Sequence, residues 1–177
     1  MQVTRHEQEG HLREAVVGPE RGGAASQTFP ADFDNPASWL HVFPLESEVV
    51  SCASAATAKG LPLGRELKTL VLQTTAGLRV VHIRGDQQLD LRAVKSALGV
   101  REAYLASGAT LKQLGLEPGI VHPFDLALWP LCHLIEQDVL DLNWVSTNAG
   151  RHDAFVVFDP VVLLRARRTL IGTYEKR

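Results

Sequence analysis

Hydrophobic and polar residues form short alternating or clustered runs along most of the chain, and these runs predict more strands than helices. Residues 67–74 (LKTLVLQT) and 78–84 (LRVVHIR) predict two strands around Thr75-Ala76-Gly77, a pattern typical of a hairpin. Residues 39–45 predict an extended segment in which Pro44 favours the edge of a sheet. Further short strands are predicted over residues 101–106, 131–137, 143–147 and 153–158.

The predicted helices are short and lie between the strands. An alanine-rich helix over residues 49–59 ends at Gly60, and Asp90 caps an amphipathic helix over residues 91–98 that ends at Gly99. Two more are predicted over residues 107–114 and from Pro160 to about residue 168. This order predicts an α/β fold of the α+β type, with a mixed, largely antiparallel central sheet and short flanking helices.

The first residues differ from the rest of the chain. Residues 1 to about 30 are rich in charge, glycine and alanine, and a helix over residues 7–17 would have only a thin apolar face. We therefore predict an N-terminal extension over residues 1–33, poorly ordered or loosely docked, and one domain over residues 34–177.

Bulk composition limits the class of protein. The chain has 177 residues, 45% of them hydrophobic, which is ordinary for one globular domain. Two distant cysteines, Cys52 and Cys132, form no disulfide framework and favour a reducing compartment. With no apolar N-terminal run and no stretch near the ~18 residues of a membrane span, we expect a cytoplasmic protein without membrane contact.

The net charge restricts nucleic-acid binding. At −2, the chain lacks the basic balance of proteins that contact many phosphates. Extensive duplex binding is therefore not expected, whereas a short single-stranded end or a small molecule remains compatible with the charge.

No common cofactor or metal motif is present. The sequence contains no GxGxxG, GxxxxGK[ST], HExxH or CxxC. His122, Cys132 and His133 are close in sequence, but neighbouring residues of a strand face opposite ways, so we expect neither a metal nor a cofactor. Cys52 and Cys132 lack flanking cations and are interpreted as small buried thiols rather than nucleophiles.

Three places combine unusual residues, and each also has a purely structural explanation. Lys68 begins an apolar strand, where it points into a polar cavity or protects a sheet edge. Residues 116–124 form a loop with two prolines and a glycine that can present backbone N–H groups to an oxyanion or simply turn the chain. Residues 146–152 form a polar turn that either borders a pocket or serves only as a turn.

Taken together and in this order, the three places resemble the YbaK/ProX family of aminoacyl-tRNA deacylases, relatives of the editing domain in bacterial prolyl-tRNA synthetases. The resemblance covers about residues 36–168. Its motifs are the strand lysine in residues 66–70, Gly-x-x-x-Pro in residues 119–123, Asn-x-Gly-x-His in residues 148–152 and Phe-Asp-Pro in residues 158–160. Residues 89–95 are similar to the family's helix after its second strand.

The resemblance implies a site and a reaction. Lys68 corresponds to the family lysine beside the aminoacyl ester and is the expected catalytic residue. The expected substrate-binding residues belong to the loop and to the turn: Gly119, His122, Pro123, Phe124, Asn148, Gly150 and His152. The family uses no metal and no covalent protein nucleophile, so water or a group of the substrate attacks the carbonyl. The turn over residues 145–149 departs from the family pattern, so the resemblance does not determine which amino-acid side chain the pocket binds.

The implied function is trans-editing of a misacylated tRNA that carries alanine, serine, threonine or cysteine. The implied partners are the aminoacylated CCA end of tRNA and an aminoacyl-tRNA synthetase, and we expect a monomer. Two alternatives stay open at this point. One is a catalytically inactive module that binds aminoacyl-tRNA or an amino acid, and the other is a hydrolase of small molecules other than tRNA.

Overall fold

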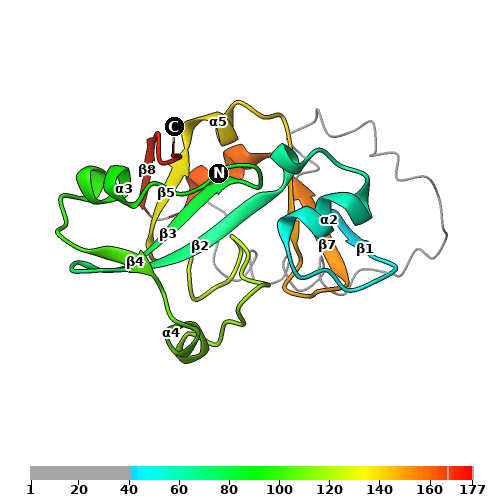
Figure 1. Ribbon diagram of the computed structural model, residues 1–177, viewed down its shortest axis with the longest axis horizontal. Coiled ribbons are helices and arrows are strands. Elements are labelled where there is room, and N and C mark those ends of the chain that lie inside the picture. The colour runs from blue at the N-terminus through cyan, green and yellow to red at the C-terminus, as the bar shows by residue number, and fades with distance from the viewer. Residues whose placement is uncertain (1–40, 167, 177) are drawn as a thin grey trace.

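Two β-sheets with short helices around them make up the protein, in a computed structural model that describes residues 41–166 and 168–176 (Figure 1). The larger sheet has the strand order β4-β2-β3-β5-β8, and the smaller sheet has the order β1-β7-β6. The predicted extension over residues 1–33 and the predicted helix over residues 7–17 lie outside the described residues.

The larger sheet is built on a hairpin. Strands β2 (Leu67–Thr74) and β3 (Gly77–Arg84) pair antiparallel along their whole length, as the alternating pattern predicted. The short strand β4 (Ala103–Leu105) covers only the last three residues of β2 on its other side. Strand β5 (Cys132–Glu136) lies parallel to β3, and β8 (Arg168–Gly172) lies parallel to β5.

The smaller sheet is antiparallel and consists of β1 (His41–Pro44), β6 (Val145–Asn148) and β7 (Ala154–Phe158). A single parallel bridge between Glu66 and Ser146 connects it to the start of β2. Four of the six strand pairs in the described part of the chain are antiparallel. The predicted fold class, a mixed and largely antiparallel sheet with short helices, is confirmed.

The helices begin and end where local capping residues allow. Helix α2 (Cys52–Lys59) is capped by Ser51 and ends at Gly60, which has the left-handed φ of 66° that glycine favours. Helix α3 (Leu91–Leu98) is capped by Asp90 and ends at Gly99. The other helical segments are α4 (Gly108–Gln113), α5 (Gln137–Leu140) and the 3₁₀ turns η2 (Leu63–Arg65) and η3 (Pro160–Arg165).

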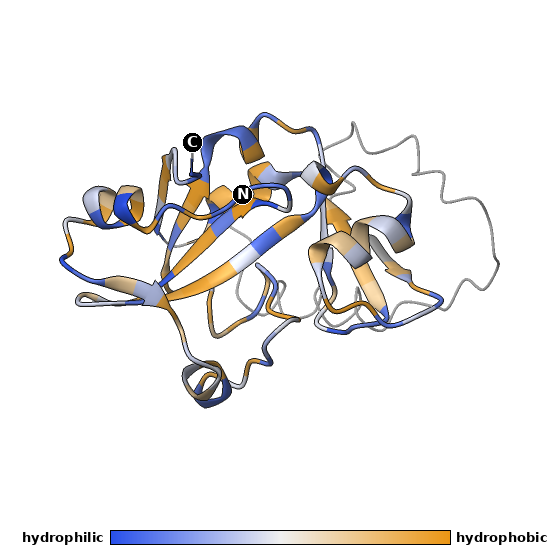
Figure 2. Ribbon diagram, viewed as in Figure 1, coloured by the Kyte–Doolittle hydropathy of each residue, from blue (hydrophilic) through white to orange (hydrophobic). Residues whose placement is uncertain are grey.

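The two faces of the larger sheet carry different packing partners, because alternate residues of a strand face opposite sides. Leu70 and Leu72 of β2 pack with Val94 of α3 on one face, whereas Val71 packs with Leu116 and Leu128 on the other. Figure 2 shows hydrophobic residues along the strands and hydrophilic stretches on α3 and α4. By the same alternation Lys68 belongs to the α3 face, and Thr69 belongs to the face covered by the loop after α4.

Three details of the sequence prediction were wrong. Strand β8 and helix α5 were not predicted, and the last helix is a 3₁₀ segment that ends at Arg165 instead of an α-helix that reaches Arg168. Asp159 accepts a hydrogen bond from the N–H of Val161 at the start of this segment, as an N-cap does. In the described ranges, no helix is both long and apolar enough to cross a membrane.

Candidate functional site

A cavity of about 410 Å³ opens at the junction of the two sheets. One wall is the outer edge of β2 over residues 67–71, and a second is the segment 49–55 at the start of α2. The loop over residues 118–121 and the end of β6 form further walls, and the remaining lining residues are Glu66, Leu105, Ala106, Leu111 and Arg151. Its volume lies within the range of about 300–1,000 Å³ that is usual for small-molecule sites.

The edge of β2 borders the cavity because β4 is too short to cover it. The carbonyl of Leu67 accepts a hydrogen bond from Thr147 Oγ1 at 3.2 Å, and the carbonyl of Val71 accepts one from Ala106 N at 2.8 Å. Both carbonyls therefore point away from β3. Since the direction of backbone groups repeats every second residue, the N–H and C=O of Thr69 point to the same edge. The cavity wall thus includes backbone donors and acceptors.

Lys68 lines this cavity near the start of β2. Its Nζ donates to the carbonyl oxygen of Gln87 at 2.7 Å, in the turn after β3. The side chain of Gln87 is in turn held by the N–H of Arg84 at 2.9 Å and by Asp138 at 2.8 Å. A lysine ammonium has three N–H donors, and the contact with Gln87 uses one of them.

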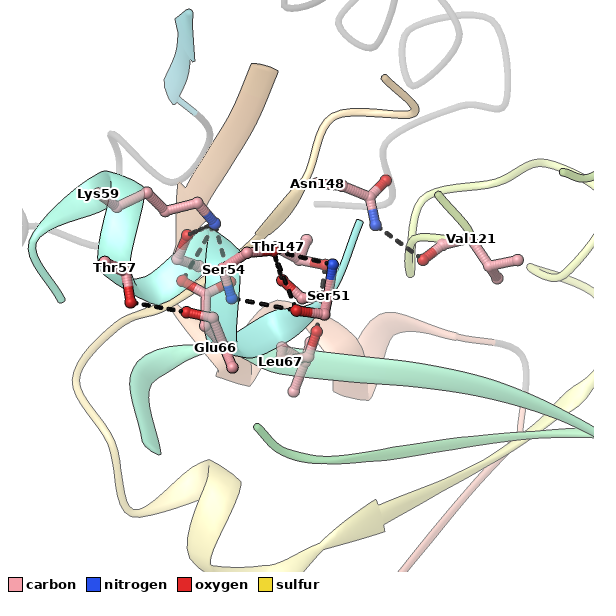
Figure 3. A network of polar contacts seen from close by, with 11 residues as sticks. Ser51, Ser54, Thr57, Lys59, Glu66, Leu67, Val121, Thr147 and Asn148 are labelled. Carbon is pink, nitrogen blue, oxygen red and sulfur yellow. Dashed lines mark hydrogen bonds and ion pairs between the residues drawn. The ribbon is translucent and has the colours of Figure 1, made fainter. Parts of the chain in front are cut away.

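Gly119 and Asn148 meet Lys68 at the same cavity. Gly119 has a φ of 94°, a value that glycine adopts without strain. Asn148 Nδ2 donates to the carbonyl of Val121 at 3.0 Å (Figure 3). Its Oδ1 accepts from the N–H of Gly150 at 2.9 Å. Asn148 therefore ties the glycine-containing loop to the end of β6.

The other predicted loop residues lie behind the cavity wall. His122 Nδ1 accepts from the N–H of Phe124 at 3.3 Å, and its Nε2 lies 3.4 Å from Asp125. Burial lowers the pKa of His122, and Asp125 opposes that shift. Pro123 is buried, and Phe124 belongs to the core, with its ring centroid 4.8 Å from that of Phe158.

Gly150 and His152 support the loops without lining the cavity. Gly150 has a φ of 74°, and a Cβ there would lie 3.2 Å from His122 Nε2. His152 Nδ1 donates to the carbonyl of Val49 at 2.9 Å, while its Nε2 is 3.7 Å from Glu117. The structure thus brings Lys68, Gly119 and Asn148 together at the cavity, and it places the remaining predicted residues in the layer behind them.

A buried ion pair beside the cavity was not predicted. Lys59 Nζ donates to both carboxylate oxygens of Glu66, at 3.0 and 2.8 Å, and to Ser146 Oγ at 2.9 Å (Figure 3). Nζ also lies 4.7 Å from the centre of the Phe155 ring. Burial lowers the pKa of Lys59 and raises that of Glu66, and each charge opposes the shift of the other. Local sequence carries no signal for these contacts of α2 with the residue before β2 and with β6.

The thiol of Cys52 also lines the cavity. Burial raises its pKa, Glu66 raises it further, and the charges of Lys68 and Lys59 oppose this. A thiol with a raised pKa stays protonated near neutral pH and is a poor nucleophile. Within the described ranges no three His, Cys, Asp or Glu side chains are grouped so that they could hold a metal ion.

Comparison with known proteins gives a family match over most of the described chain. The sequence model of the aminoacyl-tRNA editing domain matches residues 46–166, which include every wall of the cavity. The matched range also contains all the site residues predicted from the sequence.

Similar curated proteins are proline–tRNA ligases. The ligase of Xanthomonas campestris pv. campestris strain 8004 is 33% identical over 90 residues, which are 50% of this chain and 16% of the ligase. The ligase of Chlamydia caviae is 37% identical over 70 residues, 37% of this chain and 12% of that protein. The chain therefore spans only a small part of the relatives that it matches.

Similar solved structures cover much more of both chains. The hypothetical protein APE2540 superposes with a TM-score of 0.69 at 25% identity, over 77% of this chain and 91% of the other. A candidate trans-editing enzyme for prolyl-tRNA synthetase superposes with a TM-score of 0.70 at 24% identity, over 78% and 87%. At 24% identity, the similarity to the candidate trans-editing enzyme shows a shared fold.

Proposed function

Because this chain belongs to the aminoacyl-tRNA editing domain family, we propose that it is a trans-editing deacylase that hydrolyses the ester of a misacylated tRNA. The observation that carries the proposal is the meeting of Lys68, Gly119 and Asn148 at one cavity. These residues come from three separate segments of the chain, and the family resemblance assigned each of them to the site.

Lys68 is the catalytic residue of this proposal. Hydrolysis of an ester passes through a tetrahedral intermediate with a negative oxygen, which an ammonium group stabilises. Lys68 Nζ is held by Gln87 and keeps further N–H donors for that oxygen. Water or the neighbouring ribose hydroxyl is the nucleophile, since the thiol of Cys52 is protonated and the family resemblance implies no covalent enzyme intermediate.

Gly119 and Asn148 shape the binding pocket in this proposal. The loop over residues 118–121 and the apolar segment 49–50 leave a volume of about 410 Å³ next to the β2 edge. A small aminoacyl group with part of its ribose suits this volume, so alanine, serine, threonine and cysteine are the proposed residues. The proposed partners are the CCA end of tRNA and a synthetase, with the protein itself a monomer in the cytoplasm.

The test is a deacylation assay with Ala-, Ser-, Thr- and Cys-tRNA, each offered on a cognate and on a non-cognate tRNA. Wild-type protein is compared with Lys68→Ala and with Lys112→Ala, which removes an exposed lysine of α4. We expect the Lys68 variant to lose about 10²- to 10³-fold in kcat, as other enzymes do on loss of one oxyanion donor, and the Lys112 variant to lose nothing.

Circular dichroism and thermal unfolding of both variants separate loss of chemistry from loss of fold. A folded Lys68→Ala protein with wild-type deacylation would refute the role of Lys68. If wild-type protein releases no amino acid from any tRNA but binds aminoacyl-tRNA, the inactive binding module is the better assignment.

A further inference from the structure

A row of hydrogen-bonded side chains from β2, β3 and β5 runs across one face of the larger sheet and begins at the cavity. Thr69 Oγ1 lies 3.2 Å from His82 Nδ1, and His82 Nε2 lies 2.8 Å from His133 Nδ1. His133 Nε2 ends the row, 3.0 Å from the carbonyl oxygen of Leu128. Both imidazole rings are 0% exposed, and their centroids are 5.1 Å apart.

The carbonyl of Leu128 determines the direction of every bond in the row. A carbonyl oxygen can only accept, so His133 Nε2 carries the hydrogen and donates it. In a neutral imidazole the other nitrogen accepts, so His133 Nδ1 accepts from His82 Nε2, and His82 Nδ1 accepts from the hydroxyl of Thr69. Burial lowers the pKa of both histidines, which keeps both rings neutral as this pattern requires.

The hydroxyl hydrogen of Thr69 therefore points into the protein, although Thr69 itself lines the cavity. The hydroxyl oxygen of Thr69 therefore has only lone pairs left for a ligand, whereas its backbone N–H and carbonyl both point to the same edge. Thr147 repeats this arrangement, because it lines the cavity while its hydroxyl donates to the carbonyl of Leu67 at 3.2 Å. The hydroxyl oxygens of Thr69 and Thr147 therefore act as acceptors toward the cavity and suit a ligand group that donates hydrogen bonds.

Building on the proposed function, we propose that Thr69 is a specificity residue that accepts a hydrogen bond from the free α-ammonium group of the aminoacyl ester. His82 and His133 are positioning residues that hold the Thr69 hydroxyl in its accepting orientation. The α-ammonium group carries three donors and a positive charge, and hydrogen bonds with an ionised partner are the stronger ones. The chemical class selected is aminoacyl-tRNA with a free amine, and N-acylated aminoacyl-tRNA is rejected.

The experiment compares kcat/KM for one aminoacyl-tRNA and for its N-acetylated form. We expect the ratio to favour the free amine in wild type and to fall about tenfold or more in Thr69→Val, which removes the acceptor at similar volume. Thr69→Ser keeps the hydroxyl and should restore the ratio. Thr74→Val is the structural control, since Thr74 stabilises the turn of the hairpin through Gly77 and does not line the cavity.

A double-mutant cycle tests the role of the histidine pair. His82→Phe removes the acceptor of the Thr69 hydroxyl and should lower the ratio in the wild-type background but not in the Thr69→Val background. An equal effect in both backgrounds would show that His82 acts on stability alone. If His82→Phe does not fold, the Thr69→Val and Thr69→Ser pair still decides the role of Thr69.

A binding measurement separates this inference from the proposed function. The probe is a non-hydrolysable 3′-aminoacylamino-adenosine, titrated by calorimetry beside its N-acetyl form. If the protein prefers the free amine in a Thr69-dependent way but deacylates no tRNA, the role of Thr69 in recognition stands and the assignment as an enzyme is wrong. Equal affinity of wild type for both forms, or a preference unchanged in Thr69→Val, would overturn the inference.

Discussion

Lys68 Nζ lies 2.7 Å from the carbonyl oxygen of Gln87, so the turn after β3 sets the position of the proposed catalytic ammonium. Gly85 makes this turn possible, because a Cβ at that position would lie 2.5 Å from the carbonyl oxygen of Leu63. The N–H of Gly85 also donates to the carbonyl of Glu66 at 2.6 Å. The turn is therefore held by the segment that precedes β2, and through Gln87 it positions Lys68.

Replacing Gln87 should move Lys68 without removing it. Gln87→Ala leaves the N–H of Arg84 and a carboxylate oxygen of Asp138 without the amide that binds them, which should cost about 1–3 kcal/mol of unfolding free energy. We expect a several-fold lower kcat with little change in KM, measured by steady-state deacylation. Gln88→Ala is the matched control, since Gln88 is exposed and uses its backbone carbonyl to bind Lys176 N at 2.8 Å. Equal kcat in both variants would contradict the role of the turn.

The ion pair of Lys59 and Glu66 should be strongly coupled. Their side chains are only 1% and 3% exposed, so removal of one partner leaves a buried charge and should cost about 3–5 kcal/mol. Lys59→Met combined with Glu66→Leu should be less destabilised than either single variant. Urea unfolding of the three variants gives the coupling energy, and additive losses would argue against it.

The Lys59→Met variant should also acquire a characteristic pH dependence. Burial already raises the pKa of Glu66, and loss of the opposing ammonium raises it further. The folded variant then binds more protons than the unfolded chain, so its stability falls as pH rises through the raised pKa. Its deficit relative to wild type should therefore shrink toward acid pH. A deficit that is constant with pH would show that the lost charge is not the cause.

Two glycines with positive φ allow the effect of backbone strain on stability to be distinguished from an effect on deacylation. Gly119 lines the cavity with a φ of 94°, whereas Gly115 has a φ of 74° with open space around it and lies away from the cavity. Alanine at either position should cost about 1 kcal/mol or more through left-handed strain. Only Gly119→Ala should also lower deacylation, because its loop carries Ile120 and Val121 into the cavity. Equal activity of the two variants would mean that this loop does not contact substrate.

The buried histidines predict a loss of stability on mild acidification. The pKa of His82 lies well below its ordinary 6.5, first through burial and then through His133. The folded state therefore binds fewer protons than the unfolded chain below pH 6.5, and stability falls as pH falls. For His82 alone the loss should be about 1 kcal/mol between pH 6.5 and 5.5. The test is the urea midpoint of unfolding, measured as a function of pH for wild type and for His82→Phe. If the midpoint changed equally with pH in the two proteins, His82 would not be the cause.

Some features followed from the sequence alone because they depend on neighbouring residues. Asp90 and Gly99 bound α3 as predicted, and the alternation in residues 67–84 predicted the hairpin, since capping and strand alternation need only local contacts. The family, too, was predicted from motifs at fixed spacings and is confirmed by the match over residues 46–166. Strand β8 was missed because, within the described ranges, its five residues pair with β5 alone, which lies far away in the sequence.

What only the tertiary structure decided is which side chains meet. The sequence by itself determined the hairpin, the capped helices, the family and the candidate residues Lys68, Gly119 and Asn148. Their meeting at one cavity depends on β4 leaving half of the β2 edge uncovered, which no local pattern reveals. The contacts of Lys59 with Ser146 and of His82 with His133 join residues 87 and 51 positions apart. Such contacts depend on packing and burial in three dimensions, because a side chain's neighbours in a core come from distant parts of the chain.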